Sequence, residues 1–532
     1  MRPLRRAGRR QPLTRRSIRP RRRATLGLGC AIAMACPTGA ACADPIQPGA
    51  PPAPPSGRST ETPASPPAVS FLFEPIPLVD PSFSAEAPAA PAGVGPFGFL
   101  GANWNSPNLL GDMGGLRPAL AKYGVTLSIL ENVETFGNLT GGVRQGFEAD
   151  GLTTATLQVD TQKAFGLSGG LFNVSGLQYW GGNLTADNLL VLQTLSDIEA
   201  PVGVRLWELW YQQKFGDKFD IKIGEQSLDE EFFISQSSQF FINAASGWPA
   251  LPSADLPGGG PAYPLAGLGV RGRAQATDNL TVLGGLFNGS PIPKNSPNTP
   301  VSNPYGVSFP LNTGVLAIAE LQFTFGSPAP AKGGDSGPLP GTYKLGAWYD
   351  SENFDDLQYD SVGIPLASPA SNRIPTTHPG DFSIYGIMDQ MIWRSKDDSG
   401  RNLNVFIRPM FSPYQDRNLI SASLDAGVTL HGPFPGRDND SFGVEMGVAR
   451  LSNGAAGYDR DLQFYEPSAY TPVRSSETFI EATYQVQVTP WWQIQPDVQY
   501  FVNPGVGIAN PNDLTQQIKN ELVIGLRTNI TF

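Results

Sequence analysis

A serine-centred motif lies in the first half of the chain. Gly166-Leu167-Ser168-Gly169-Gly170 fits the G-x-S-x-G pattern, in which a hydrolase presents its nucleophile on a tight turn between a strand and a helix. Here the motif falls in a short link between two predicted strands, and no helical pattern follows it. The motif therefore predicts a turn rather than a nucleophile.

A second motif points to no chemistry either. Residues 267–272 read Gly-Leu-Gly-Val-Arg-Gly and fit G-x-G-x-x-G, but they lie within a predicted strand instead of opening a helix, so they do not indicate a dinucleotide site.

The chain holds two histidines, His378 and His431, each beside Pro or Gly in a predicted loop. Such scarcity argues against His-dependent catalysis and a multi-His metal site. We expect no enzyme activity, no catalytic residues, no cofactor and no metal.

The longest link between predicted strands, residues 227–265, combines acidic, amide and aromatic side chains. Its candidate solute-binding residues are Asp229, Glu230, Glu231, Gln236, Gln239, Asn243 and Trp248, set among Phe232, Phe233, Phe240 and Phe241. Polar groups and aromatic faces can replace a sugar's hydrogen bonds with water while binding weakly enough to release it. We expect this loop to fold inward and narrow a passage through the protein. The alternative is an external loop that packs on its neighbours.

Strand alternation supplies further candidates. In the predicted strand 266–277, Arg271 and Arg273 lie on the face opposite Leu268 and Val270. An Arg that faces lipid at the bilayer midplane costs roughly 2–4 kcal/mol, so we expect both to face the lumen of a membrane barrel.

The predicted strand 202–214 is assigned in the same way. We expect Glu208, Trp210 and Gln212 to face inward and Trp207, Leu209 and Tyr211 to face outward. Inward Arg and Glu could form a ladder that binds hydroxyls, or an ion-pair network that only shapes the wall. Trp210 could stack on a sugar ring or simply pack.

The elements that position these residues alternate with a period of two from residue 125 onward. We predict sixteen strands, at 124–136, 152–161, 170–180, 202–214, 218–226, 266–277, 279–289, 314–325, 341–351, 381–396, 401–412, 418–430, 441–452, 477–489, 491–503 and 519–532. Most approach the length that crosses a bilayer at a tilt. A short helix, 117–123, leads into the first strand. The fold class is therefore all-β, a transmembrane antiparallel barrel.

A water-soluble β-sandwich shows the same alternation, so other features must separate the two. The chain contains 60 Gly and 10% aromatic residues, and Trp491, Trp492, Tyr500 and Phe532 stand at strand ends, as in the aromatic girdles of membrane barrels. Short links follow the predicted strands 4, 6, 10 and 14, and long links follow most odd-numbered strands. This asymmetry is typical of outer-membrane barrels and predicts both termini in the periplasm.

The N-terminal 107 residues form two segments. Residues 1–43 predict a signal peptide, because 11 Arg and no acidic residue precede Ala24, a short apolar stretch follows, and Ala41-Cys42-Ala43 matches a cleavage site. Residues 44–107 predict a Pro/Ala-rich periplasmic linker, mostly disordered.

Cleavage there would remove all 3 cysteines and leave 37 − 11 = 26 basic residues against 47 acidic ones, a net charge of 26 − 47 = −21. This charge argues against nucleic acid as a partner.

Several motifs, in order, resemble the carbohydrate-selective porin (OprB) family. They are the opening Gly111-Asp112-Met113-Gly114-Gly115-Leu116-Arg117, the stretches 205–213, 224–233, 240–243, 247–249 and 261–270, and the closing 496–500, 503–505 and 525–527 with a terminal Phe532. The resemblance covers about residues 108–532. Met113 stands where the family has Trp, and the Pro-rich segment is longer than the family needs.

The resemblance implies a sixteen-stranded porin of the cell outer membrane through which mono- and disaccharides diffuse. It also implies outer-membrane lipid and lipopolysaccharide as surroundings, and recognition of the last strand, ending in Phe532, by the barrel-assembly machinery. A homotrimer is left open. The alternatives are a general or anionic-solute porin, a barrel enzyme, and a soluble periplasmic polysaccharide-binding protein.

Overall fold

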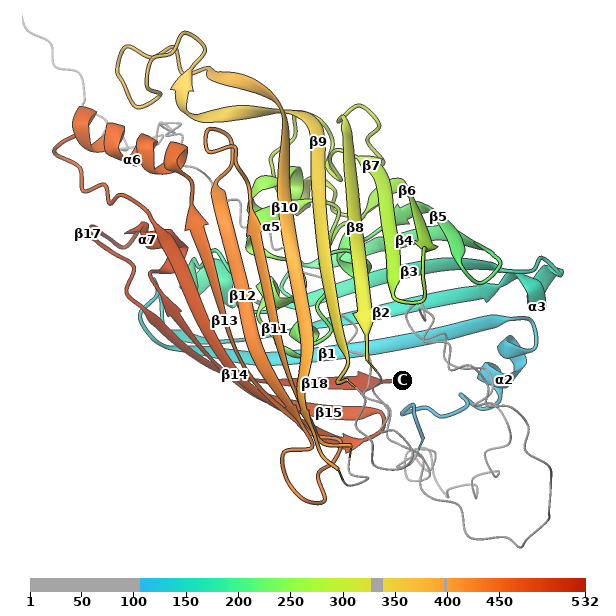
Figure 1. Ribbon diagram of the computed structural model, residues 1–532. Coiled ribbons are helices and arrows are strands. Elements are labelled where there is room, and N and C mark those ends of the chain that lie inside the picture. The colour runs from blue at the N-terminus through green and yellow to red at the C-terminus, as the bar shows by residue number, and fades with distance from the viewer. Residues whose placement is uncertain (1–105, 327–337, 397–399) are drawn as a thin grey trace, which may run out of the picture. The chain divides into compact units, whose positions relative to one another are not determined.

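A closed barrel of sixteen antiparallel strands forms the body of the protein (Figure 1). The computed structural model describes residues 106–326, 338–396 and 400–532, so the predicted signal peptide and nearly all of the predicted linker lie outside the described residues. Neighbours in sequence are neighbours in the barrel, and β1 closes the ring by pairing with β18. The predicted fold class and strand number are confirmed.

Each predicted strand overlaps one strand of the barrel. The first eight are β1 Val125–Thr140, β2 Gly146–Asp160, β3 Gly170–Gly181, β4 Gly203–Phe215, β5 Phe219–Gln226, β6 Gly267–Gln275, β7 Leu280–Asn288 and β8 Val315–Phe325. The others are β9 Gly341–Asp360, β10 Pro375–Arg394, β11 Asn402–Phe411, β12 Ile420–His431, β13 Ser441–Leu451, β14 Ser476–Thr489, β15 Trp492–Val502 and β18 Glu521–Thr531. A small separate pair, β16 Ala509–Asn510 and β17 Asp513–Gln517, lies between β15 and β18.

Alternation of polar and apolar residues accounts for the two faces of the wall. In β8, Glu320 is buried whereas Leu321 and Phe323, which flank Gln322, are exposed on the outer face. In β18, Arg527 is buried and its neighbour Leu526 is exposed. Apolar side chains facing lipid and polar side chains facing the lumen are the pattern of a membrane barrel.

The two ends of the barrel differ, and we name them by their links. The turn end carries the links after even-numbered strands, such as 216–218 and 276–279, together with the C-terminus and the helix α3 Thr161–Phe165. The loop end carries 182–202, 227–266, 289–314 and the other links after odd-numbered strands. β9 and β10 have 20 residues each and run further toward the loop end than predicted.

Helices are few. The predicted N-terminal helix is present as α2 Leu116–Ala121, whereas α6 Asn453–Tyr465, in the link after β13, was not predicted. Four-residue α7 Pro504–Gly507 follows β15. Within the described ranges, no helix is long and apolar enough to cross a membrane.

Residues 106–124, the described segment before the barrel, contact the last strand near the seam between β1 and β18. The amide of Leu109 donates to the carbonyl oxygen of Thr531 at 2.8 Å. The guanidinium of Arg117, from α2, donates to the carbonyl oxygens of Leu127 and Phe532. The segment before the barrel is therefore fastened to the last strand.

Candidate functional site

The link between β5 and β6, residues 227–266 and here called the inner loop, lies inside the barrel. It contains η3 Leu228–Glu230, η4 Ser238–Phe240, α4 Ala244–Gly247, α5 Ala250–Asp255 and η5 Pro257–Gly259. Polar wall side chains from seven strands bond to it: Glu320, Lys344, Asp389, Arg408, Glu445, Glu481 and Gln495. Such contacts around the ring require an inward course, not a loop packed outside the barrel mouth.

Many of these hydrogen bonds are made by backbone groups of the inner loop. The two carboxylate oxygens of Glu481 accept from the amides of Ile242 and Asn243 at 2.7 and 2.8 Å. The Nζ of Lys344 donates to the Ile234 carbonyl at 2.7 Å. A buried loop must satisfy its backbone polar groups, and here the polar lumenal wall supplies the partners.

Apolar packing holds the other side of the inner loop. Phe233 and Trp248 meet edge to face with ring centroids 4.8 Å apart, and Phe233 also lies 4.3 Å from the ring of Tyr385 on β10. Trp348 of β9 belongs to the same cluster of buried hydrophobic side chains. The interior is therefore packed like a protein core on this side.

A second link also folds inward. Within residues 182–202, which include η2 Thr185–Leu189, the stretch 193–200 is buried, whereas Ala186, Asp187 and Val202 are exposed. The amides of Leu192 and Gln193 donate to Glu477 of β14 at 2.8 and 2.7 Å, and the Ala244 amide of the inner loop donates to the Thr194 carbonyl at 3.0 Å. Strand alternation does not predict this inward course, although the apolar run 189–192 within a link was a usable signal.

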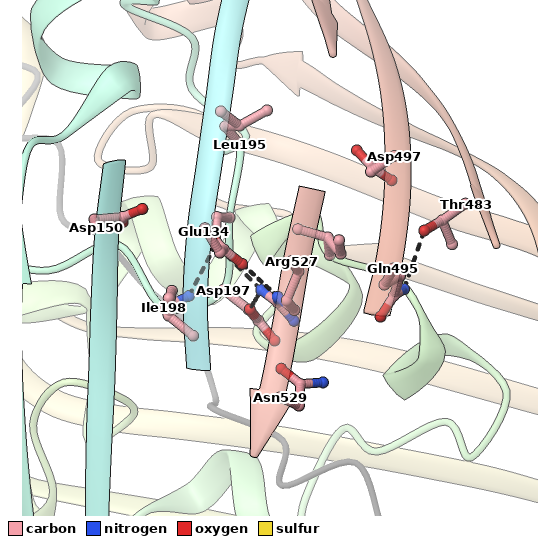
Figure 2. A network of polar contacts seen from close by, with 12 residues as sticks. Glu134, Asp150, Leu195, Asp197, Ile198, Thr483, Gln495, Asp497, Arg527 and Asn529 are labelled. Atoms are coloured by element: carbon pink, nitrogen blue, oxygen red, sulfur yellow. Dashed lines mark hydrogen bonds and ion pairs between the residues drawn. The ribbon is translucent and has the colours of Figure 1, made fainter. Parts of the chain in front are cut away.

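An ion-pair network ties this second loop to the barrel seam (Figure 2). Arg527 of β18 contacts Glu134 of β1 and Asp197 of the loop. Burial raises the pKa of Asp197 to about 6, although the Arg527 cation opposes the shift. Nearby, the amide of Gln495 donates to the Thr483 hydroxyl at 3.0 Å. Breaking one partner of such a buried pair leaves an uncompensated charge, so the network fixes the loop in place.

A second ion cluster joins the inner loop to β5 and β6. Arg271 contacts Glu231 of the inner loop through Nη2 at 2.8 Å, and Lys222 pairs with the same carboxylate. Arg273 donates from Nε to Asp220 at 2.8 Å. Burial alone would raise the pKa of Glu231, but Lys222 and Arg271 lower it to about 2. Glu231 therefore stays ionised at any ordinary pH.

These residues border a polar cavity of about 270 Å³ between the inner loop and the wall. Six of the eight sequence-predicted site residues line it: Glu208, Trp210, Glu230, Glu231, Arg271 and Arg273. Lys222 and Lys344 line it too and were missed, although alternation in 218–226 places Lys222 beside Asp220 on the inward face. A neighbouring cavity of about 370 Å³ shares Gln236 and Thr342 with it.

The other two predicted site residues lie elsewhere. Asp229 turns back on its own loop, where it accepts hydrogen bonds from the Ser227 hydroxyl and, at 3.1 Å, from the Tyr263 amide. Burial raises the pKa of Asp229 to about 7. Trp248 is fully buried and donates from Nε1 to the Gly259 carbonyl at 2.9 Å. Both hold the loop's shape and do not border the cavity.

The orientation predicted for Trp207 is wrong. Trp207 is 4% exposed and packs edge to face on Tyr263 of the inner loop, with ring centroids 6.4 Å apart. The register with β3 shifts here, since Ser175 faces Glu208 while the next residue, Gly176, faces Leu206. This β-bulge inserts an extra residue, so Trp207 and Glu208 are both buried and simple alternation fails.

Trp210 offers little surface to a solute. Its side chain is 4% exposed, and Lys222 Nζ lies 4.4 Å from the ring centroid. Glu208, from the same strand, accepts from the Ser227 amide at 3.1 Å and so helps to hold the start of the inner loop.

Comparison with known proteins identifies the family. The model of the carbohydrate-selective porin, OprB family, matches residues 144–532. The chain belongs to this family. It is an outer-membrane porin, a channel and not an enzyme.

Two porins match most of this chain in sequence, and one solved structure matches its fold. Porin B of Pseudomonas aeruginosa is 24% identical over 80% of this chain and 92% of its own length. The putative porin QuiX of Acinetobacter baylyi is 23% identical over 76% of this chain and 90% of its own. The high-pH structure of Pseudomonas putida OprB matches with a TM-score of 0.70 at 22% identity, over 80% of this chain and 99% of that one.

Proposed function

We propose that mono- and disaccharides cross this porin past the inner loop and bind weakly in the cavity between that loop and the wall of β4, β5 and β6. The observation that carries the proposal is the mixed polar lining of the cavity, which includes charged, amide and hydroxyl groups. Its volume, about 270 Å³, is slightly below the roughly 300–1,000 Å³ of typical small-molecule sites. Weak binding suits conduction, since the solute must also leave.

The charges around the cavity favour a neutral solute over an ion. The cations are Lys222, Arg271, Arg273 and Lys344, and the carboxylates are Glu208, Asp220, Glu230, Glu231 and Glu320. Arg273 pairs with Asp220, and Lys344 Nζ lies 3.9 Å from Glu320. Because the positive and negative charges nearly balance, the cavity offers many hydrogen-bonding groups but little net electric field to attract ions of one sign.

Polar side chains, and not an aromatic platform, are proposed to contact the sugar. Arg273, Gln236 and Lys344 donate, and Glu231 accepts through lone pairs not used by its cations. Trp210 is too covered to stack on a ring, so its proposed role is to support Lys222.

Liposome swelling tests the proposal against a general porin. Refolded protein in vesicles should admit glucose and maltose faster than uncharged polyols of matched size, and KCl gradients should give a small reversal potential. Equal rates for all solutes of one size would indicate a general porin. A large reversal potential would indicate an ion-selective channel.

We also propose the surroundings of the barrel. The turn end, which carries the C-terminus and the described segment 106–124, faces the periplasm, and outer-membrane lipid and lipopolysaccharide surround the wall. The barrel-assembly machinery recognises the last strand ending in Phe532. Residues 1–43 serve as the signal peptide and 44–107 as a linker. A homotrimer stays a prediction that gel filtration in detergent would test.

A further inference from the structure

The barrel wall is notched at its loop end beside β4. β5 and β6 have 8 and 9 residues, whereas β4 has 13. β5 pairs with β4 only as far as Glu225 opposite Leu209, because the chain then turns into the barrel interior as the inner loop. Residues 203–208 of β4 therefore continue toward the loop end with no β5 strand beside them.

The link after β7, residues 289–314, reaches this free edge. The amide of Leu206 on β4 donates to the carbonyl oxygen of Tyr305 at 2.9 Å. Gly306 follows with φ +63, and a Cβ there would lie only 1.9 Å from the Leu206 carbonyl oxygen. The segment is thus pressed against the β4 backbone in the place a strand would occupy.

Buried polar side chains fix this segment on its inner side. Asn303 is 2% exposed, and its Nδ2 donates to the carbonyl oxygens of Pro291 and Ser308 at 3.0 and 3.2 Å. Asn288, at the end of β7, donates to the Pro310 carbonyl at 3.2 Å. The segment has a defined inner face and outer face.

The outer face is apolar. Its exposed side chains alternate along the chain: Tyr305, Val307, Phe309 and Leu311, with Val301 before them. Residues 295–314 contain no Asp, Glu, Lys, Arg or His. An exposed apolar stretch of this kind marks contact with something other than water.

This apolar face continues the lipid-facing surface of the barrel. Below the notch, Ile223, Val270 and Leu286 are exposed and directly paired across β5, β6 and β7. On β4 itself, Val204 is exposed beside the segment. A charge on such a surface costs energy in lipid, which fits the uncharged sequence.

We propose that segment 301–311 closes the notch in the barrel wall and presents Tyr305, Val307, Phe309 and Leu311 to the acyl chains of the outer leaflet. It is a membrane-contacting part of the wall and not a solvent-exposed loop. The gap exists because the inner loop turns into the barrel after β5. The link after β7, which comes later in the chain, fills this gap.

Site-directed spin labelling tests this assignment. The three native cysteines are changed to Ser in the full chain, and single cysteines are placed at Val307 or Leu311, with Ile223 as the lipid-facing reference and Val362, in the exposed link after β9, as the water-facing reference. The labelled proteins are reconstituted in phosphatidylcholine vesicles. Accessibility to oxygen and to a water-soluble nickel chelate is then measured. Heat-modifiable gel mobility identifies the folded fraction, and two label sites guard against a variant that does not fold.

Labels at Val307 and Leu311 should show the oxygen-to-nickel ratio of Ile223, roughly tenfold above that of Val362, because the nickel chelate is excluded from lipid. A ratio equal to that of Val362 would overturn the proposal and make the segment a solvated loop. Spin–spin broadening between labels, removed by dilution with unlabelled protein, would also overturn it, since a second copy would then cover the face.

Discussion

The guanidinium of Arg271, on β6, faces the carboxylate of Glu231, on the inner loop, with Nη2 2.8 Å from Oε1. The side chains are 2% and 17% exposed. This pair joins the barrel wall to the loop that occupies its interior, close to the polar cavity.

Arg271→Gln should destabilise the barrel and loosen the inner loop. Removing one partner of a buried ion pair costs about 3–5 kcal/mol, because the remaining charges lose their compensation. The temperature at which heat-modifiable mobility is lost should fall, and a double-mutant cycle with Glu231→Gln should give a clear coupling energy. Arg460→Gln, with the same charge change on the exposed side of α6, is the matched control. Additive effects of the two substitutions would show that the pair does not hold the loop.

Arg408→Lys should release the middle of the inner loop. Arg408 is fully buried and donates to the carbonyl oxygens of Phe233, Ser246 and Gly247 at 2.9, 3.0 and 3.3 Å. Lysine keeps the charge but cannot reproduce this fan of donors. Single-channel recordings should show a larger and noisier conductance than the wild type. An unchanged, quiet conductance would mean that the loop does not need these bonds.

Glu477→Gln should free the second inward loop. The carboxylate accepts from the amides of Leu192, Gln193 and Gly505 at 2.8, 2.7 and 2.6 Å. An amide nitrogen in place of one oxygen would face an N–H donor, at a cost of about 1–3 kcal/mol. Limited proteolysis should cut within 182–202 in the variant but not in the wild type. Equal resistance in both proteins would contradict this role.

Mild acid should stabilise the inner loop through Asp229. Burial raises its pKa to about 7 from an ordinary 3.8, although hydrogen bonds from Ser227 and Tyr263 oppose the shift. Between pH 3.8 and about pH 7, Asp229 is therefore protonated in the native state and ionised in the unfolded chain. Stability from this group is fully present below pH 3.8 and is lost as the pH rises through 7.

The unfolding temperature should consequently rise from pH 8 to pH 5, and this rise should be smaller in Asp229→Asn. Glu231 acts in the opposite sense at lower pH: its pKa of about 2 lies below the ordinary 4.5, so its stabilisation is lost as the pH falls from 4.5 toward 2. Identical pH profiles for the wild type and Asp229→Asn would contradict the assignment to Asp229.

The sequence predicts the wall better than the contents of the barrel. Period-two alternation reports which face of a strand is apolar, and this is a local property, so all sixteen strands were found. The bulge at Trp207 reversed one orientation, because an inserted residue leaves no mark in the alternation. Six of the predicted site residues meet at one cavity, because β4 and β6 flank β5 and the inner loop that carries Glu230 and Glu231 folds against them.

The bonds that fix the inner loop were beyond the reach of sequence patterns. Glu481 and Ile242 are 239 positions apart, and nothing local pairs them. The loop 182–202 was missed for the same reason, because its partners Glu477 and Arg527 lie on late strands. Trp248 and Asp229 were expected at the passage because of their residue types. Instead, both form hydrogen bonds with other residues of the inner loop and do not face the cavity.

Single-channel block by sugar, compared between the wild type and Arg273→Gln, tests whether sugars bind between the inner loop and the wall. Arg273 lines the cavity and is more exposed than Arg271, at 14% against 2%. Glucose, maltose and sucrose are titrated in turn, with Arg460→Gln as the control. Loss of a charged hydrogen bond to a sugar hydroxyl, worth about 1.5 kcal/mol, should weaken block by roughly tenfold in Arg273→Gln and leave the control unchanged. Block of equal strength in all three proteins, or no block in the wild type, would contradict sugar binding between the inner loop and the wall.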